Sequence, residues 1–232
     1  MSDSHRHFEV AVSAEALALA WARREAATAG SVVIVDHEIS PRGRLGRLWP
    51  GAQERTAVIA IVWRPMLRAE QADLVWIAAS LGLLTSVRAL LGPSATGLWW
   101  PDLVVDAGER RIGETRAEVQ LGPGRVASAV ITARLDLDAF PGASRDTAVE
   151  CLIAGLDSAG DHLDGDIDLL RVAYADSCVL VGRRVTARLL PQGAARGTVR
   201  GVDALGRLEL ASVTGLVERV TIVGLDRLEV VT

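Results

Sequence analysis

The chain has 232 residues, half of them apolar, and a formal net charge of −4 at pH 7. This charge argues against a nucleic-acid-binding protein, which normally presents a basic face, and the length allows one sizeable core plus a small appended domain. The sequence contains no lysine and no asparagine, and its 25 basic residues are all arginine, which excludes any mechanism that needs a lysine Schiff base.

Targeting and metal-binding signals are not found in the sequence. No apolar run reaches the roughly 18 residues that span a bilayer, and the N-terminal segment does not resemble a signal peptide. We therefore expect a cytoplasmic protein that does not enter a membrane. Cys151 and Cys178 lie far apart, and the four histidines lack metal-ligand spacing, so reduced thiols are expected and no metal site is predicted.

The N-terminal part predicts alternating strands and helices. Short apolar or alternating runs indicate strands, whereas apolar residues at every third or fourth position indicate an amphipathic helix, which is expected to end before Gly92-Pro93. The predicted segments are strands at 8–12, 32–37 and 56–64 and helices at 14–28 and 68–91.

Turns recur in the middle of the chain, where hairpins predict a mostly antiparallel sheet. Its strands are expected at 103–105, 110–121 and 125–135. Two helical segments follow, at 145–157 and 163–176, with a break predicted at the acidic stretch between them.

The character of the sequence changes near residue 178, after which short strands follow one another at regular spacing. This pattern predicts a small SH3-like β-barrel and a domain boundary that separates residues 1–178 from residues 179–232. The predicted strands are 183–190, 196–202, 207–213 and 216–223.

An arginine-rich loop follows the strand at 32–37. Glycine lets the backbone approach a ligand closely, and guanidinium groups bind phosphate in bidentate fashion. The composition of this loop therefore indicates a phosphate site. We refer to residues 40–49 as the arginine loop; its candidate ligand-binding residues are Arg42, Gly43, Arg44, Gly46, Arg47 and Trp49.

Two motifs resemble those of the biotin–protein ligases in the biotin/lipoate ligase superfamily, and the resemblance covers nearly the whole chain. The segment 41–47 matches six of seven positions of that family's Gly-Arg-Gly-Arg-x-Gly-Arg loop. Residues 99–103 stand where the family has Lys-Trp-Pro-Asn-Asp, and residues 110–113 stand where it has Lys-x-x-Gly. The resemblance implies an α+β fold, with a class II synthetase-like mixed or antiparallel sheet flanked by helices.

The resemblance also implies roles for individual residues. Arg110 falls on the family lysine that approaches the acid carboxylate and the phosphate, so it is the candidate catalytic residue. The implied ligand-binding residues outside the arginine loop are Ser13, Glu38, Trp100, Pro101, Asp102 and Gly113.

The chain also departs from the family pattern. The first family lysine is replaced by Trp99, and Glu38 replaces a glutamine. The family's Gly-x-Gly-x-Asn stretch aligns near residues 132–136, where the glycines are lost. Without these glycines, the approach of a ring to this strand should be crowded.

Two hypotheses for the function remain open. In the first, an ATP-dependent ligase forms an acyl-adenylate from biotin or another carboxylic acid, with magnesium neutralising the polyphosphate, and transfers the acyl group to a carrier protein or another amine, which includes a small-molecule amine. In the second, an inactive relative binds an acyl-AMP or a partner. The chain starts without a basic winged helix, so DNA regulation is not expected. Either a monomer or a homodimer is possible.

Overall fold

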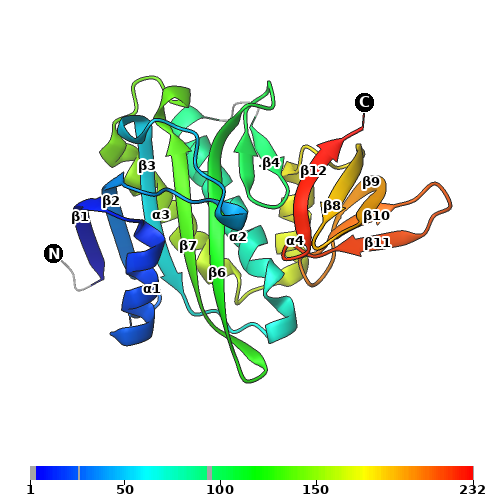
Figure 1. Ribbon diagram of the computed structural model, residues 1–232, viewed down its shortest axis with the longest axis horizontal. Helices are drawn as coiled ribbons and strands as arrows, with labels where there is room; N and C mark the ends of the chain where they lie inside the picture. The colour runs from blue at the N-terminus through cyan, green and yellow to red at the C-terminus, as the bar shows by residue number, and fades with distance from the viewer. Residues whose placement is uncertain (1–3, 26, 93–95, 232) are drawn as a thin grey trace.

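The computed structural model describes residues 4–25, 27–92 and 96–231. Figure 1 shows a large layered part and, beside it, a smaller sheet that contains the C-terminus. Pro93, predicted to help end the central helix, lies outside the described residues.

The larger part is organised around a seven-stranded sheet with the strand order β1-β2-β3-β7-β6-β5-β4. The β1 and β2 strands run parallel, and every other neighbouring pair is antiparallel. This confirms the predicted mixed α+β architecture. The strands are β1 (His5–Ala11), β2 (Val32–Glu38), β3 (Thr56–Trp63), β4 (Gly97–Trp99), β5 (Leu103–Val105), β6 (Arg111–Gly122) and β7 (Arg125–Asp136).

Helices cover both faces of this sheet (Figure 1). The α1 helix (Ala14–Arg24) is capped by Ser13, whose side chain accepts a hydrogen bond from the Ala16 N–H, and it packs on one face through Ala14, Ala18 and Trp21. The other face carries α2 (Asp73–Leu91) and α3 (Arg145–His162), and α4 (Ile167–Ser177) follows α3.

The α3 helix is longer than the sequence indicated. The break predicted after residue 157 does not occur, and the helix continues to His162. Leu156 and Ala159 lie on its buried face, so packing against the core outweighs the poor helix propensity of the acidic, glycine-containing stretch.

The segment Ala69–Leu91 has the length and apolar content of a membrane-spanning helix, with a mean hydropathy of 1.8 over its most apolar window. No run of this kind was predicted from the sequence. Within the molecule 61% of that window is buried, because α2 packs between the sheet and α3. A core helix passes the same test of length and composition.

The smaller sheet is antiparallel and has the order β11-β10-β9-β8-β12. Its edges, β11 and β12, do not pair with each other among the described residues, so a closed SH3-like barrel is not confirmed. The last strand, β12, was not predicted from the sequence. The strands are β8 (Arg184–Leu189), β9 (Ala194–Val202), β10 (Leu208–Ala211), β11 (Val217–Val220) and β12 (Leu225–Val230).

Candidate functional site

The arginine loop folds into a compact turn over the sheet face that carries α1. It contains a short 3-10 helix, Arg44–Gly46, in which Leu45 and Gly46 have positive φ angles of 57° and 71°. The Gly43 N–H donates to the Arg47 carbonyl at 2.8 Å, and Arg42 and Leu48 form a β-bridge. Glycine at position 46 therefore meets a conformational requirement of the turn.

A cavity of about 180 Å³ lies between this loop, the β4–β5 turn and β12. Ligand pockets typically measure roughly 300–1,000 Å³, so the cavity holds only a small molecule or part of a larger one. Its walls are rich in arginine and tryptophan. The lining residues are Gly43, Arg44, Arg47, Leu48, Trp99, Trp100, Pro101, Asp102, Leu103, Arg111, Glu114, Leu225, Arg227 and Leu228.

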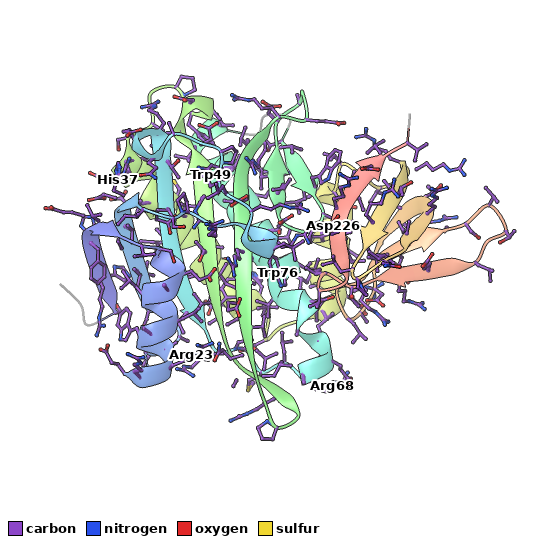
Figure 2. The ribbon with its side chains drawn as sticks, viewed as in Figure 1. Arg23, His37, Trp49, Arg68, Trp76 and Asp226 are labelled. Carbon is purple, nitrogen blue, oxygen red and sulfur yellow. The ribbon has the colours of Figure 1, made fainter. Side chains whose placement is uncertain are left out.

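The loop arginines that line the cavity are bound to the smaller sheet. Arg44 donates to Asp102 Oδ2 at 3.2 Å and to the carbonyls of Leu225 and Asp226. Arg47 donates to Asp226 Oδ1 at 2.7 Å. Figure 2 labels Asp226 on the side of the smaller sheet that faces the larger one. These contacts hold the arginine loop against β12.

Adjacent arginines on β6 and just before it have different surroundings. The Arg110 side chain is 55% exposed and pairs with Asp106 at 3.2 Å, outside the cavity. Arg111 lines the cavity, pairs with Glu114 at 3.3 Å and stacks on the Trp49 ring at 4.7 Å. Of these two residues, Arg111 therefore brings a guanidinium group to the cavity, whereas Arg110 precedes β6 and is held by Asp106 in the β5–β6 turn.

The Trp-Pro turn forms the rear wall of the cavity. Trp100 is 1% exposed, and its Nε1 has no hydrogen-bond partner among the described residues. The Pro101 carbonyl accepts a hydrogen bond from Ser80 Oγ at 2.7 Å, which ties the turn to α2. Burial raises the pKa of Asp102, and the Arg44 guanidinium opposes this shift.

A buried ionic network underlies the arginine loop. Arg134 on β7 is completely buried, donates from Nε to Glu38 Oε2 at 2.8 Å and lies 3.6 Å from Glu114 Oε1. Its Nη1 also donates to the Arg42 carbonyl at 3.1 Å. The other Glu38 oxygen accepts the Ala14 N–H at the start of α1. Arg134 thus joins two strands to the loop backbone.

Glu114 connects this network to the cavity. Burial raises its pKa to about 7, against the opposing effects of Arg134 and Arg111. A Cβ atom on Gly43 would lie 2.6 Å from Glu114 Oε1, so glycine at position 43 makes room for this carboxyl group. The sequence predicted that glycine in this loop lets a ligand approach the backbone, but at Gly43 the group that approaches is the Glu114 side chain.

The site residues predicted from sequence fall into two groups. Gly43, Arg44, Arg47, Trp100, Pro101 and Asp102 line the cavity. The others lie elsewhere: Ser13 at the α1 N-cap, Glu38 in the buried network, Arg42 and Gly46 in the outer part of the loop, Trp49 against Thr56, Arg110 at the turn, and Gly113 against Leu83 and Leu135.

Four charged residues at or next to the cavity were missed, namely Arg111, Glu114, Arg134 and Arg227. The loss of glycines near residues 132–136 was the available signal for Arg134. Arg227 lies on the strand that was not predicted, so no signal indicated it. No group of three or more His, Cys, Asp or Glu side chains in the described part of the chain could hold a metal ion.

A family model, curated relatives and solved structures all show similarity between this chain and biotin protein ligases. Residues 180–226 match the family model described as the biotin protein ligase C terminal domain. The bifunctional ligase/repressor BirA of Bacillus spizizenii is 22% identical over 208 residues, which cover 81% of this chain and 63% of that protein. The chain thus covers less than two thirds of this curated relative.

Solved structures share the fold at low sequence identity. The biotin protein ligase of Aquifex aeolicus, in complex with biotin and ATP, has a TM-score of 0.78 and 13% identity, covering 99% of this chain and 100% of that one. A biotin protein ligase-like protein of unknown function from Silicibacter sp. TM1040 has a TM-score of 0.72 and 16% identity, covering 94% of each chain.

Proposed function

We propose that this chain, a divergent member of the biotin–protein ligase family, binds an acyl-adenylate in the cavity beneath its arginine loop and forms it from ATP and a small carboxylic acid. The observation that carries the proposal is the convergence of Arg44, Arg47 and Arg111 on one cavity. Guanidinium groups that line one cavity suit the binding of a phosphate and an acid carboxylate.

The chemistry requires charge stabilisation more than a protein nucleophile. A carboxylate oxygen attacks the α-phosphorus of ATP, and the bond from that phosphorus to pyrophosphate breaks. An amine then attacks the acyl carbon, the bond to AMP breaks, and the amine loses a proton. Arg111 is placed to stabilise the negative charge in both steps, because it lines the cavity and is held by Trp49 and Glu114.

The acid we propose is smaller than biotin. The resemblance aligns Arg134 with the glycine-rich stretch near the biotin ring, and here its guanidinium fills the space between Glu38 and Glu114. The remaining space near Glu38, Pro41 and Trp49 is about 10 Å³, roughly the minimum that holds one water. A fused bicyclic ring does not fit there.

The residues that line this cavity do not form a magnesium site. The two carboxyl groups that line it, Asp102 and Glu114, are already paired with Arg44 and Arg111. These pairs do not fit a resident divalent cation, which usually needs free carboxylates. We therefore derive no step through a protein-bound metal.

Pyrophosphate exchange into ATP tests the proposal. The purified protein should catalyse exchange with at least one acid from a panel of short aliphatic, hydroxy and aromatic acids, and biotin should give none. Exchange supported by biotin alone would refute the proposal that the acid is smaller than biotin. No exchange with any acid would refute the proposal that the chain is a ligase.

One observation favours a second candidate, a protein that binds without catalysis. Arg44 and Arg47 already donate to Leu225 and Asp226, so these guanidinium groups are partly satisfied before any ligand arrives. A protein of this type should bind an acyl-adenylate analogue, and melt at a higher temperature with it, while giving no pyrophosphate exchange.

A further inference from the structure

A second and larger cavity lies where α2, α3 and α4 meet. Its volume is about 390 Å³, which lies within the usual range for small-molecule pockets. The α2 and α3 helices cover the sheet face opposite to α1, and none of the residues that line this cavity lines the cavity under the arginine loop. The proposed ligase chemistry does not use it.

Small residues form the floor of this helical cavity. A Cβ atom on Gly82 would lie 2.8 Å from the Gly155 carbonyl and 2.9 Å from Ala159 Cβ, so α2 and α3 approach closely at this point. Because glycine and alanine supply no side chains long enough to fill the space, a hollow remains beside α4. Its walls include Leu81, Leu169, Leu170 and Ala173.

Two polar side chains at this cavity, His162 and Asp166, offer hydrogen-bond acceptors. His162 Nδ1 lies 2.6 Å from the Ser158 carbonyl, which can only accept, so Nδ1 carries a hydrogen and Nε2 is the ring nitrogen left to accept one. Asp166 uses Oδ1 to cap α4 by accepting the Asp168 N–H at 2.8 Å. Its Oδ2 accepts no hydrogen bond from any described residue.

Among the described residues that line the cavity, Asp166 is the one acidic residue, and Arg171 on the same helix is paired with Asp168 at 2.8 Å. Residues 157–168 contain no arginine, and His162 is their only basic residue. Leu169, on the wall, is 69% exposed, so an apolar surface adjoins an acidic one. The acidic residues of this stretch are Asp157, Asp161, Asp164, Asp166 and Asp168.

We propose that the cavity between α2, α3 and α4 binds a small hydrophobic amine. The ammonium group lies between Asp166 and His162 and donates to both, while the apolar body lies against Leu81, Leu169 and Ala173. A carboxylate ligand is disfavoured because its charge would lie beside the Asp166 carboxylate. A short alkylamine without an apolar body leaves the walls exposed to water.

Calorimetric titration with three probes tests this proposal, using 2-phenylethylamine, 3-phenylpropionate and ethylamine. Binding of 2-phenylethylamine should be at least about tenfold tighter than binding of either other probe, consistent with one charge-assisted hydrogen bond. No binding of 2-phenylethylamine, or equal binding of 3-phenylpropionate, would overturn the proposal.

Two variants locate the bound amine. Asp166→Asn removes the charge but keeps an effective N-cap, and it should weaken binding about tenfold or more. Asp168→Asn, two residues further along the chain and outside the cavity lining, should leave binding unchanged. Ala173→Phe should abolish binding by filling the cavity. If Asp166→Asn, folded by circular dichroism, binds as tightly as the parent chain, the amine lies elsewhere and the proposal is wrong.

Discussion

At the scale of single residues, the main feature is a set of ionic side chains buried where the sequence predicted a ligand. Arg134 has no exposed surface and pairs with Glu38. A buried ion pair contributes little net stability, but breaking it leaves an uncompensated charge. Replacing either Arg134 or Glu38 alone should therefore lower the free energy of unfolding far more than replacing both together.

Arg134→Met should lower the free energy of unfolding by about 3–5 kcal/mol, because Glu38 loses its partner. The double variant Glu38→Gln/Arg134→Met should recover much of this loss. Arg125→Met, at the exposed start of the same strand, is the control and should stay within about 0.5 kcal/mol of the parent chain. Urea denaturation measures all three, and a double variant as unstable as the single one would contradict the network.

Glu114 predicts a specific dependence of stability on pH. Its folded-state pKa is raised from 4.5 to about 7, so between these values the folded chain holds a proton that the unfolded chain has lost. The free energy of unfolding should then fall as pH rises through this window, by about 3 kcal/mol. Glu114→Gln should remove this dependence and be the more stable protein at pH 8.

Denaturation curves at pH 5 and pH 8 measure this effect. Glu118→Gln changes a more exposed carboxyl group on the same strand and should retain the pH dependence of the parent chain. Parallel pH profiles for the parent chain and Glu114→Gln would show that Glu114 ionises normally.

At the scale of elements, the arginine loop is held closed from two sides. Arg134 and Arg116 donate to the carbonyls of Arg42 and Gly43 from the larger sheet, and Arg44 donates to β12 in the smaller one. The position of this loop and its glycines could be predicted from sequence, since both are local. Its contacts with Leu225 and Asp226 could not, because they join residues about 180 positions apart.

Removal of the contact with β12 should loosen the arginine loop. Arg44→Ala should increase the rate of trypsin cleavage after Arg42 or Arg47 by about threefold or more, because cleavage follows local opening. Mass spectrometry of the early fragments measures the rate. Arg110→Ala, which removes an exposed arginine outside the cavity, should leave it unchanged, and equal rates in both variants would mean that β12 does not hold the loop.

The same reasoning explains the other differences from the sequence reading. Hydrophobic periodicity located β2, β3, β6, β7 and α2 well, because each buries a continuous apolar face. The strand β12 is partly exposed along its length, so its pattern was weak. The side chain that fills the space between Glu38 and Glu114 was unpredictable, since a buried arginine depends on partners from other strands.

At the scale of the whole molecule, the two sheets share one hydrophobic core. Leu180, Leu208 and Leu225 belong to the same buried cluster as Leu98 and Trp100, and the cavity under the arginine loop takes residues from both sheets. The predicted boundary near residue 178 thus lies in a part of the chain where the packing is continuous. The two parts should unfold together.

A thermal melt tests this expectation. All six tryptophans precede residue 101, so their fluorescence reports on the larger part, while hydrogen exchange of residues 184–230 reports on the smaller sheet. The two midpoints should coincide within error. If the smaller sheet melted first, the larger part and the smaller sheet would be separate folding units. The cavity under the arginine loop would then exist only while the two units are docked.

The most direct test of the proposed function compares two neighbouring arginines. Titration with a short-chain acyl sulfamoyl-adenosine, a stable acyl-adenylate analogue, should give binding that Arg111→Gln weakens about tenfold or more, since a charge-assisted hydrogen bond is worth roughly 1.5–3 kcal/mol. Arg110→Gln should bind like the parent chain. Loss of affinity in Arg110→Gln alone, or no binding by the parent chain, would contradict an adenylate site beneath the arginine loop.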